Sequence, residues 1–312
     1  MAVPAHDGIG PLFALSSFAA QATHGPRRTI HGGKRHVILE WSVGRQVFLL
    51  SPQSSALSPY LLTLNSGIFE LMRNLISALQ FITILPLGKA KSFDPPSMVP
   101  YFPLVGILLG LMVALFDAVV IRFWTPPVAA LLDVILLAVL TAAFHLDGLG
   151  DTADGLLAPR SRDTALEIMK DSRLGTMGLV AILFGLALKW GGIASLDAHR
   201  SILLIMIPAY ARAGILFGMR YLPYGRPDGT GKPFFSEKLS LKHFWGLIFP
   251  VGLSLILGFK AIWLNLAFVI MIAMILLFYK KRMGCITGDM LGAMVEITEA
   301  GLFLVISIGG VL

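Results

Sequence analysis

The chain has 312 residues, of which 56% are hydrophobic and only 14% are charged, and its mean hydropathy is +0.78. A soluble domain is about 45–50% apolar and about 25% charged, so this composition excludes an ordinary soluble protein and predicts an integral membrane protein. The net charge of +7 is better explained by basic loops on one side of a membrane than by binding to nucleic acid. The single cysteine, Cys285, excludes an intramolecular disulfide bond.

Residues 1–71 differ in character from the rest of the chain. They contain scattered Gly, Pro and Ser and basic residues such as Arg27 and Lys34, without a sustained hydrophobic period. The apolar run at 47–50 is too short for a signal sequence or a membrane span. We expect residues 1–71 to be a disordered extension, or the product of a start codon upstream of the true start at Met72. Residues 72–312 are expected to form the membrane domain.

The first organised segment is the amphipathic stretch at 75–87, which Pro86 and Gly88 end. It is shorter than the roughly 20 residues that cross hydrocarbon, so we expect an interfacial or re-entrant helix. About seven spans follow, which predicts an all-α, polytopic helical membrane bundle. The predicted spans are 103–121, 127–144, 177–195, 201–219, 243–259, 261–279 and 295–312.

Basic residues are concentrated in alternate connections between the predicted spans. The connections at 122–126, 196–200 and 260 are short and carry one Lys or Arg each. The other connections carry Lys89, Lys91, Arg160, Arg162, Lys170, Arg173, Arg220, Arg226, Lys232, Lys238, Lys242, Lys280, Lys281 and Arg282. Because positive loops stay on the cytoplasmic side, we expect these connections to face the cytoplasm of a bacterial inner membrane.

The stretch from His145 to Gly155 contains three carboxylates and a histidine directly after an apolar run. On an α-helix, Asp147, Asp151 and Asp154 lie within roughly 60° of one another. Such a cluster at a membrane boundary is costly to desolvate and would be stabilised by a hard divalent cation that also carries phosphate. A hydrophilic loop is the alternative, but a loop needs no helical register of acids.

A basic and hydroxyl-rich segment follows at 163–178, where a short helix is predicted. Lys170 and Arg173 are three residues apart and would share a helical face that can hold an anion. Ser172, Gly175 and Thr176 add hydroxyl and backbone N–H donors near the start of the next helix, where phosphate is favoured. A solvated, salt-bridged loop is the alternative reading of the same residues.

Three charged residues fall inside predicted spans. Arg212 lies in the cytoplasmic half of its span, where it would reach a pyrophosphate or an acidic residue. Asp133 and Lys189 each lie about six residues from the outer end of their spans, and we expect them to pair with each other. The later segment Gly229–Lys232 resembles the end of a nucleotide-binding P-loop, but Pro233 stands where Ser or Thr must bind the metal.

A second acidic set opens the last predicted span, where Thr287, Gly288 and Asp289 are followed by Glu296 and Glu299. On one helix the three acids lie within roughly 80° of one another. Acids at this depth are costly unless they face a polar cavity. They therefore indicate a shared metal site or a separate catalytic base, unless basic loops simply neutralise them.

Several motifs together resemble the cobalamin synthase family, whose members are adenosylcobinamide-GDP ribazoletransferases. They are the acidic stretch at 145–155, the Lys-Asp-Ser-Arg-Leu-Gly-Thr run at 170–176, the Thr-Gly-Asp segment at 287–289, and the segments 79–86 and 101–106. The resemblance covers about residues 72–312. Ile84 departs from it, since the family usually has Arg there.

The resemblance implies the last step in assembling the nucleotide loop of vitamin B12. Adenosylcobinamide-GDP would react with α-ribazole or its 5′-phosphate, giving adenosylcobalamin or its 5′-phosphate and GMP, with Mg²⁺ as cofactor. The expected partners are these two substrates and membrane lipid, without nucleic acid, and the oligomeric state is left open.

Each candidate residue then has an expected role in phosphoryl transfer, which depends mainly on alignment and charge neutralisation. Asp147, Asp151 and Asp154 are expected to bind magnesium, with Asp289 as a further ligand. Lys170, Ser172, Arg173, Thr176 and Arg212 are expected to bind phosphate. His145, Glu296 or Glu299 is expected to take the proton from the ribazole hydroxyl.

Two other functions compete with this interpretation. A CDP-alcohol phosphotransferase also uses membrane-surface aspartates and magnesium, but its Ala-Arg element is missing after Asp147-Gly148. A cation-coupled transporter would carry acids near the bilayer midplane, whereas the acids here collect at one face.

Overall fold

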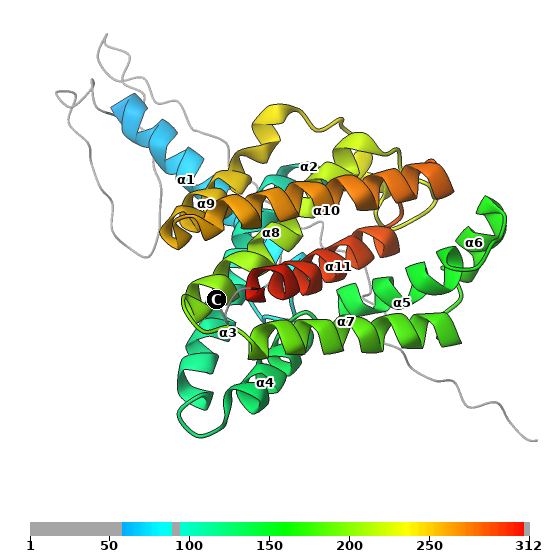
Figure 1. Ribbon diagram of the computed structural model, residues 1–312. Coiled ribbons are helices and arrows are strands. Elements are labelled where there is room, and N and C mark those ends of the chain that lie inside the picture. The colour runs from blue at the N-terminus through cyan, green and yellow to red at the C-terminus, as the bar shows by residue number, and fades with distance from the viewer. Residues whose placement is uncertain (1–57, 89–93, 309–312) are drawn as a thin grey trace, which may run out of the picture. The chain divides into compact units, whose positions relative to one another are not determined.

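The computed structural model describes residues 58–88 and 94–308. In that part of the chain the secondary-structure elements are all helices (Figure 1). The prediction of an all-α bundle is therefore confirmed. The helices are α1 Ser58–Ile82, α2 Pro95–Met98, η2 Val99–Tyr101, α3 Phe102–Val120, α4 Pro126–Leu140, α5 Phe144–Leu156, α6 Arg162–Ile168, α7 Thr176–Ala194, α8 Arg200–Tyr221, η3 Lys232–Phe235, η4 Leu241–Leu247, α9 Ile248–Ser254, η5 Leu255–Leu257, α10 Lys260–Arg282 and α11 Gly288–Ser307. Most of the expected extension, Lys89, Lys91 and residues 309–312 lie outside the described residues.

Among the described residues, five helices are long and apolar enough to cross a membrane, and six are if the bent pair α4–α5 counts as one span. The predicted number of about seven is thus not confirmed for the described residues. The segment at 243–259 accounts for the difference, because it forms η4, α9 and η5 rather than one span. Together these form one apolar helical segment, Leu241–Leu257, which is too short to count as a span and ends before Gly258, where φ is 59°.

The predicted span at 127–144 is also shorter than expected, because α4 ends at Leu140 and α5 leaves at an angle of 89°. Ala142 and Ala143 have φ values of 49° and 55°, which are not helical, so they separate α4 from α5. The backbone N–H of Ile84 donates to the carbonyl of Leu140, which the break leaves without a helical partner. The break turns the acidic stretch away from the direction of α4.

The amphipathic stretch at 75–87 forms the end of α1, which stops at Ile82. This helix begins at Ser58, so it includes residues 58–71 of the expected extension. α1 is not among the helices that are apolar enough to span a membrane. On its last turns Ala78, Leu79 and Ile82 are buried, and they join the hydrophobic core formed by Leu64–Leu312.

Among the candidate spans, α8 and α11 are the most buried. α11 packs against α5, α7, α8 and α10, and it lies between α10 and α7 in Figure 1. α3 packs closely against α8 because Gly106 and Gly110, one turn apart, leave no room for side chains there. A Cβ on either glycine would collide with the backbone of α8. Small residues spaced four apart are the usual device for close helix contact in membranes.

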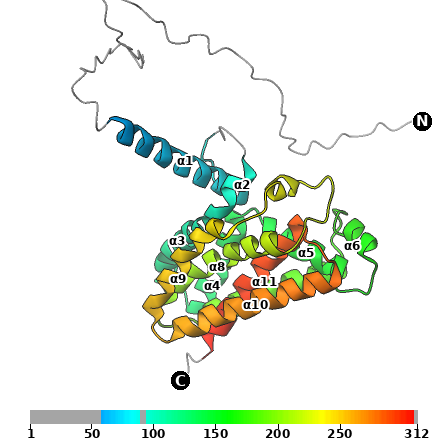
Figure 2. The same cartoon turned by 90° about the horizontal axis from the view of Figure 1, so that it is seen from above.

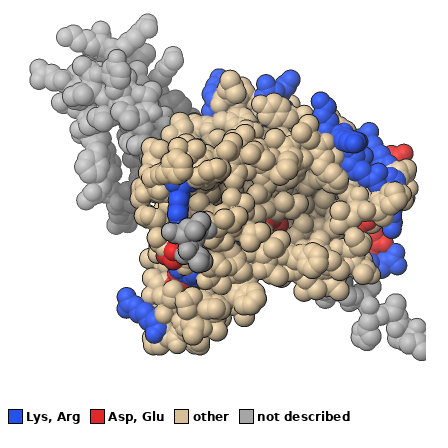
Figure 3. All heavy atoms as spheres, in the orientation of Figure 1, with Lys and Arg blue, Asp and Glu red and all other residues tan. Residues whose placement is uncertain are grey.

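The charged side chains are unevenly distributed over the bundle. Seen from above, α6 and the last turn of α10 lie at the end of the bundle opposite α9 (Figure 2). In Figure 3 most Lys and Arg side chains on the visible face gather at this end, with acidic side chains between them. α10 contributes Lys280, Lys281 and Arg282 in its last turn. The broad face between the ends carries few charged side chains in Figure 3, as expected for a surface in contact with lipid.

Candidate active site

The acidic stretch forms α5, and the start of α11 lies directly against it. The approach is close because Gly148 has no side chain: a Cβ there would lie 2.7 Å from the carbonyl oxygen of Asp289. Gly292, one turn further along α11, faces His145 in the same way. Thr287 caps α11 by accepting a hydrogen bond from the N–H of Met290 at 3.2 Å. These contacts fix Asp289 beside the carboxylates of α5.

Asp147, Asp151 and Asp289 form an acidic cluster at this crossing. Asp147 is exposed and the other two are half-buried. The negative charges of Asp147 and Asp289 both act on Asp151, as does the positive charge of Arg226. Arg226 donates from Nη2 to Oδ2 of Asp289 at 2.6 Å. No described residue bonds to the side chain of Asp147 or Asp151, so their oxygens are available to a ligand.

Asp154, the third predicted ligand on α5, has different surroundings. Its carboxylate accepts hydrogen bonds from the N–H of Gly175 at 2.7 Å and from the N–H of Gly178 at 2.8 Å. These groups lie at the N-terminus of α7, where a negative charge also compensates the helix dipole. The position predicted to hold a phosphate therefore contains the carboxylate of Asp154, which links α5 to α7.

The other residues predicted to bind phosphate there lie on an exposed turn between α6 and α7. Lys170, Ser172, Arg173 and Thr176 are all exposed, and Lys170 and Arg173 are not on a common helix. Arg173 donates from Nε and Nη2 to the carboxylate of Asp171. These bonds lower the pKa of Asp171 below its usual value. This matches the salt-bridged loop considered as the alternative, and no described contact joins the turn to the acidic cluster.

The remaining candidates belong to a buried ion network between α7, α8 and α11. Lys189 donates from Nζ to Glu296 at 2.7 Å and to Glu299 at 2.6 Å. Arg212 donates to the second oxygen of Glu299 and, at 3.3 Å, to the carbonyl of Pro208. Two cations and two carboxylates balance, which is how charges are tolerated at this depth. Carboxylates held in this way are poorly placed to act as bases.

His145 lies next to this network and is 2% exposed. The charges of Arg212, Glu299 and Lys189 act on its ring. Its Nδ1 atom has no hydrogen-bond partner among the described residues. The structure thus buries all three predicted bases, and no described hydrogen bond joins them to Asp147 or Asp151.

The predicted pair of Asp133 and Lys189 is wrong. Lys189 pairs with the acids of α11, whereas Asp133 accepts a bond from Arg200 at 3.1 Å. The same guanidinium group binds Asp117 through Nε and Nη2. Depth along a span can be estimated from sequence, but the choice of partner depends on which helices are neighbours.

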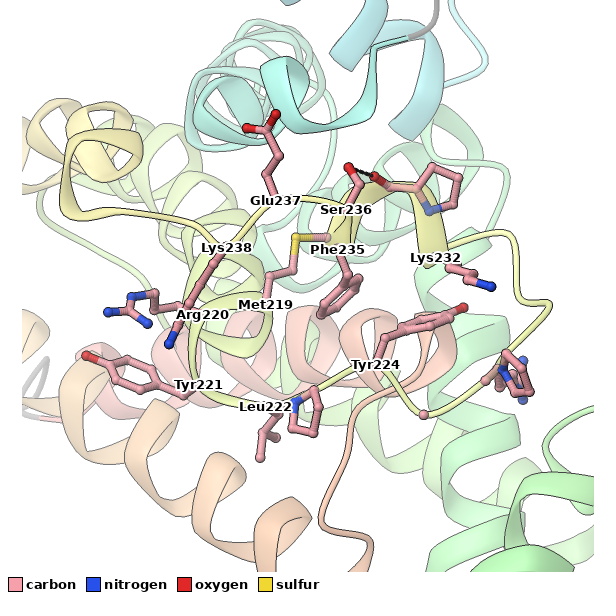
Figure 4. A pocket seen from close by; sticks show the side chains of 15 residues that line it. Met219, Arg220, Tyr221, Leu222, Tyr224, Lys232, Phe235, Ser236, Glu237 and Lys238 are labelled. Atoms are coloured by element: carbon pink, nitrogen blue, oxygen red, sulfur yellow. Dashed lines mark hydrogen bonds between the residues drawn. The ribbon is translucent and has the colours of Figure 1, made fainter.

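A cavity of about 1030 Å³ lies beside the acidic cluster, between the end of α8 and the loop that follows it (Figure 4). We call it the basic cavity, because four cations and one acid line it together with three aromatic rings. These residues are Arg220, Arg226, Lys232, Lys238, Glu237, Tyr221, Tyr224 and Phe235. Arg226 belongs to both places, since it lines the cavity and binds Asp289.

Comparison with known proteins identifies the family. The model of the cobalamin-5-phosphate synthase family (CobS) matches residues 74–307. Adenosylcobinamide-GDP ribazoletransferase of Alkaliphilus metalliredigens is 38% identical over 244 residues, which are 75% of this chain and 95% of the relative. The enzyme of the same name from Pseudomonas paraeruginosa is 36% identical over 247 residues, 77% of this chain and 99% of the relative. The chain belongs to the cobalamin-5-phosphate synthase family.

Membership in the cobalamin-5-phosphate synthase family confirms the resemblance that the motifs indicated. The Tyr101–Gly106 motif ends in the glycine that contacts α8, so it has a packing role in the fold. Ile84, which departs from the family pattern, has an exposed side chain, and its backbone N–H donates a hydrogen bond to the carbonyl of Leu140. No solved structure matches the chain.

A family magnesium ion was expected at the acidic cluster, and the residues fit it. Within the described residues, no group of three or more His, Cys, Asp or Glu side chains could hold a metal by itself. Magnesium needs no such cage, because it commonly uses one or two carboxylates and takes its other ligands from water and substrate phosphates. Asp147 and Asp151, one turn apart and without partners, match that requirement.

The importance of Arg226 and of the basic cavity was not predicted from the sequence. Arg226, Lys232 and Lys238 were interpreted there only as loop charges that set membrane orientation. The loop contained a signal, since cations alternate there with Tyr221, Tyr224 and Phe235. What could not be foreseen is that the loop folds back: Gly225 and Ile286 share a backbone hydrogen bond of 2.9 Å, which brings Arg226 to α11.

Proposed function

We propose that this chain is an adenosylcobinamide-GDP ribazoletransferase of the bacterial cytoplasmic membrane. The observation that carries the proposal is the pair of unpartnered carboxylates, Asp147 and Asp151, beside Asp289 and Arg226, in a chain of this family. The relatives named above carry this activity in their names. The cation-rich end of the bundle would face the cytoplasm, where charged nucleotide substrates are found.

In the proposed reaction, a hydroxyl oxygen of α-ribazole or its 5′-phosphate attacks the phosphorus attached to the corrinoid arm. A new phosphate ester bond forms, the bond from that phosphorus to the bridging oxygen breaks, and GMP leaves while the hydroxyl proton is released. Bound magnesium would neutralise charge on the pyrophosphate. Asp147 and Asp151 would hold it, as they offer four free carboxylate oxygens on one face of α5.

Arg226 is suited to bind the same pyrophosphate. Its Nη2 donates to Asp289, while Nε is buried and has no hydrogen-bond partner among the described residues. A guanidinium group with unused donors binds phosphate oxygens strongly. Asp289 would fix the orientation of Arg226 through their ion pair. This arrangement aligns the phosphates, which is the main protein contribution to phosphoryl transfer.

Replacing Asp151 by Asn tests the proposal. Membranes that contain the wild-type chain should release GMP from adenosylcobinamide-GDP when α-ribazole and magnesium are present. The Asp151→Asn variant should lose at least about 100-fold in rate, because it removes charge that holds the metal. Asp163→Asn, an exposed acid on α6, is the matched control and should remain active.

Two results would contradict the proposal. Normal GMP release by Asp151→Asn would show that the acidic cluster does not take part in the reaction. Release of CMP from a CDP-alcohol substrate, without release of GMP, would assign the chain to lipid synthesis instead. The amount of each variant in the membrane is measured by immunoblot, so that a loss of protein is not read as a loss of catalysis.

A further inference from the structure

The basic cavity contains more positive charge than the acidic cluster needs. Arg226 is paired with Asp289, but no described acid lies within salt-bridge distance of Arg220, Lys232 or Lys238. Figure 4 shows Arg220, Lys238 and Tyr221 together at one end of the cavity, with Phe235 and Tyr224 between them and Lys232. A cavity that holds three cations without a described acid partner is suited to a second anionic group.

The middle of the cavity offers an aromatic surface. The rings of Tyr224 and Phe235 lie 4.9 Å apart and are tilted by 35°. The hydroxyl of Tyr224 accepts a hydrogen bond from the N–H of Gly231 at 3.1 Å, which fixes the ring. A Cβ at Gly229 or Gly231 would collide with Tyr224, so both glycines allow the loop to close around it. Fixed aromatic rings beside cations are typical of sites that bind a heteroaromatic base and its phosphate.

We propose that the basic cavity binds the nucleoside substrate as its 5′-phosphate, with Arg220 and Lys238 holding that phosphate. This proposal rests on the proposed function. The base would stack against Phe235, and the attacking hydroxyl would point toward Arg226 and the acidic cluster. The volume of about 1030 Å³ is sufficient for a nucleotide.

The chemistry of the reaction favours this nucleoside over the guanosine of the other substrate. The phosphate of the departing GMP is part of the pyrophosphate, so it must lie at the acidic cluster. Guanosine carries no second anion and would leave Arg220 and Lys238 unused. A ribazole 5′-phosphate keeps its phosphate in the product, so that group stays away from the reacting phosphorus and needs cations of its own.

The test uses the full chain in lipid nanodiscs, with GMP release measured at saturating adenosylcobinamide-GDP. In the double variant Arg220→Gln and Lys238→Gln, the KM for ribazole 5′-phosphate should rise at least about 10-fold, since two charge-assisted contacts are lost. The KM for unphosphorylated α-ribazole should stay within about 2-fold. The charge-conserving variant Arg220→Lys with Lys238→Arg should stay close to wild type. Lys242→Gln, an exposed lysine that does not line the cavity, is the control.

The outcomes separate the alternatives. An equal rise in KM for both forms of ribazole, or no rise for either, overturns the phosphate contact. A rise in KM for adenosylcobinamide-GDP alone, measured in a second series at saturating ribazole 5′-phosphate, assigns the cavity to guanosine and also overturns the phosphate contact. The wild-type chain provides a check without any substitution, because it should prefer the 5′-phosphate form.

Calorimetry with ribazole 5′-phosphate alone distinguishes a failure here from a failure of the proposed function. If the wild-type chain binds ribazole 5′-phosphate and the double variant of Arg220 and Lys238 does not, the cavity assignment is supported even if no GMP is released. Turnover without such a difference in binding overturns the cavity assignment and leaves the proposed function intact.

Discussion

Asp151 and Asp154 are three residues apart on α5, yet their carboxylates have different surroundings. Asp154 accepts two backbone hydrogen bonds from α7, whereas Asp151 has no bonding partner among the described residues and lies near other acids. A bonded carboxylate stabilises the fold, and one left among like charges is ready for a cation. Asp154 therefore has a structural role, whereas Asp151 is available to bind a ligand.

The sequence could predict the common helical face of these acids, because α5 has the expected register. It could not predict which of these acids would accept hydrogen bonds from the protein itself. The donors to Asp154 are Gly175 and Gly178, which follow 21 and 24 residues later and come from another helix. For the same reason the sequence could not show that Glu296 and Glu299, both candidate bases, are paired with Lys189.

Removing the charge of Lys189 tests the buried ion network. Lys189→Met leaves Glu296 without its cation and Glu299 with Arg212 alone. Loss of one partner from a buried pair typically costs about 3–5 kcal/mol, so we expect a strong fall in thermal stability. The measurement is the unfolding temperature of the purified chain in detergent.

A double variant provides the control for this prediction. Lys189→Met with Glu296→Gln removes one charge of each sign, so it should recover part of the stability that Lys189→Met loses. An unfolding temperature for Lys189→Met that equals that of wild type would contradict the network. If Glu296 is instead the catalytic base, Glu296→Gln alone would abolish GMP release in a stable protein.

At the scale of the helices, the contact between α3 and α8 depends on two glycines. Gly106→Leu places a side chain against the backbone of α8, which cannot rotate away as a side chain can. Overpacking of this kind costs about 1–3 kcal/mol or more, so the unfolding temperature should fall. Gly191→Leu on α7 is the matched control, since a Cβ there meets nothing within 4 Å. Equal stability of the two variants would contradict the close contact.

The helices were predictable where composition alone determines them. α3, α7, α8 and α10 match predicted spans because each is a long apolar run. The errors lie where local backbone geometry matters: at Ala142 and Ala143, which break α4 from α5, and at 241–257, which forms three short helices. The hydropathy of these segments resembles that of spans, so the pattern of apolar residues did not reveal the breaks.

At the scale of the whole molecule, the candidate site combines segments that are far apart in sequence. α5, the loop after α8 and the start of α11 meet at the acidic cluster through Gly148, Arg226 and Asp289. Each segment was recognisable alone as acidic or basic. Their meeting depends on the bend after α4 and on the backbone hydrogen bonds of Ile286 with Gly225 and Pro223, which no local pattern specifies.

The same arrangement allows a prediction of the side of the membrane on which the site lies. α8 is a single candidate span, with Asp197 in the connection before it and Asp228 in the loop after it. The two loops must therefore lie on opposite sides if α8 crosses the bilayer. Since the loop after α8 carries most of the cations of the basic cavity, the positive-inside rule predicts that Asp228 is cytoplasmic.

Cysteine labelling tests this orientation. In a background where the single cysteine is removed by Cys285→Ala, Asp197→Cys and Asp228→Cys each introduce one exposed thiol. A membrane-impermeant maleimide should label Asp197→Cys in intact cells, and Asp228→Cys only after the cells are permeabilised. The reverse pattern would put the acidic cluster outside the cell, away from nucleotide substrates, and labelling of both in intact cells would mean that α8 does not cross the membrane.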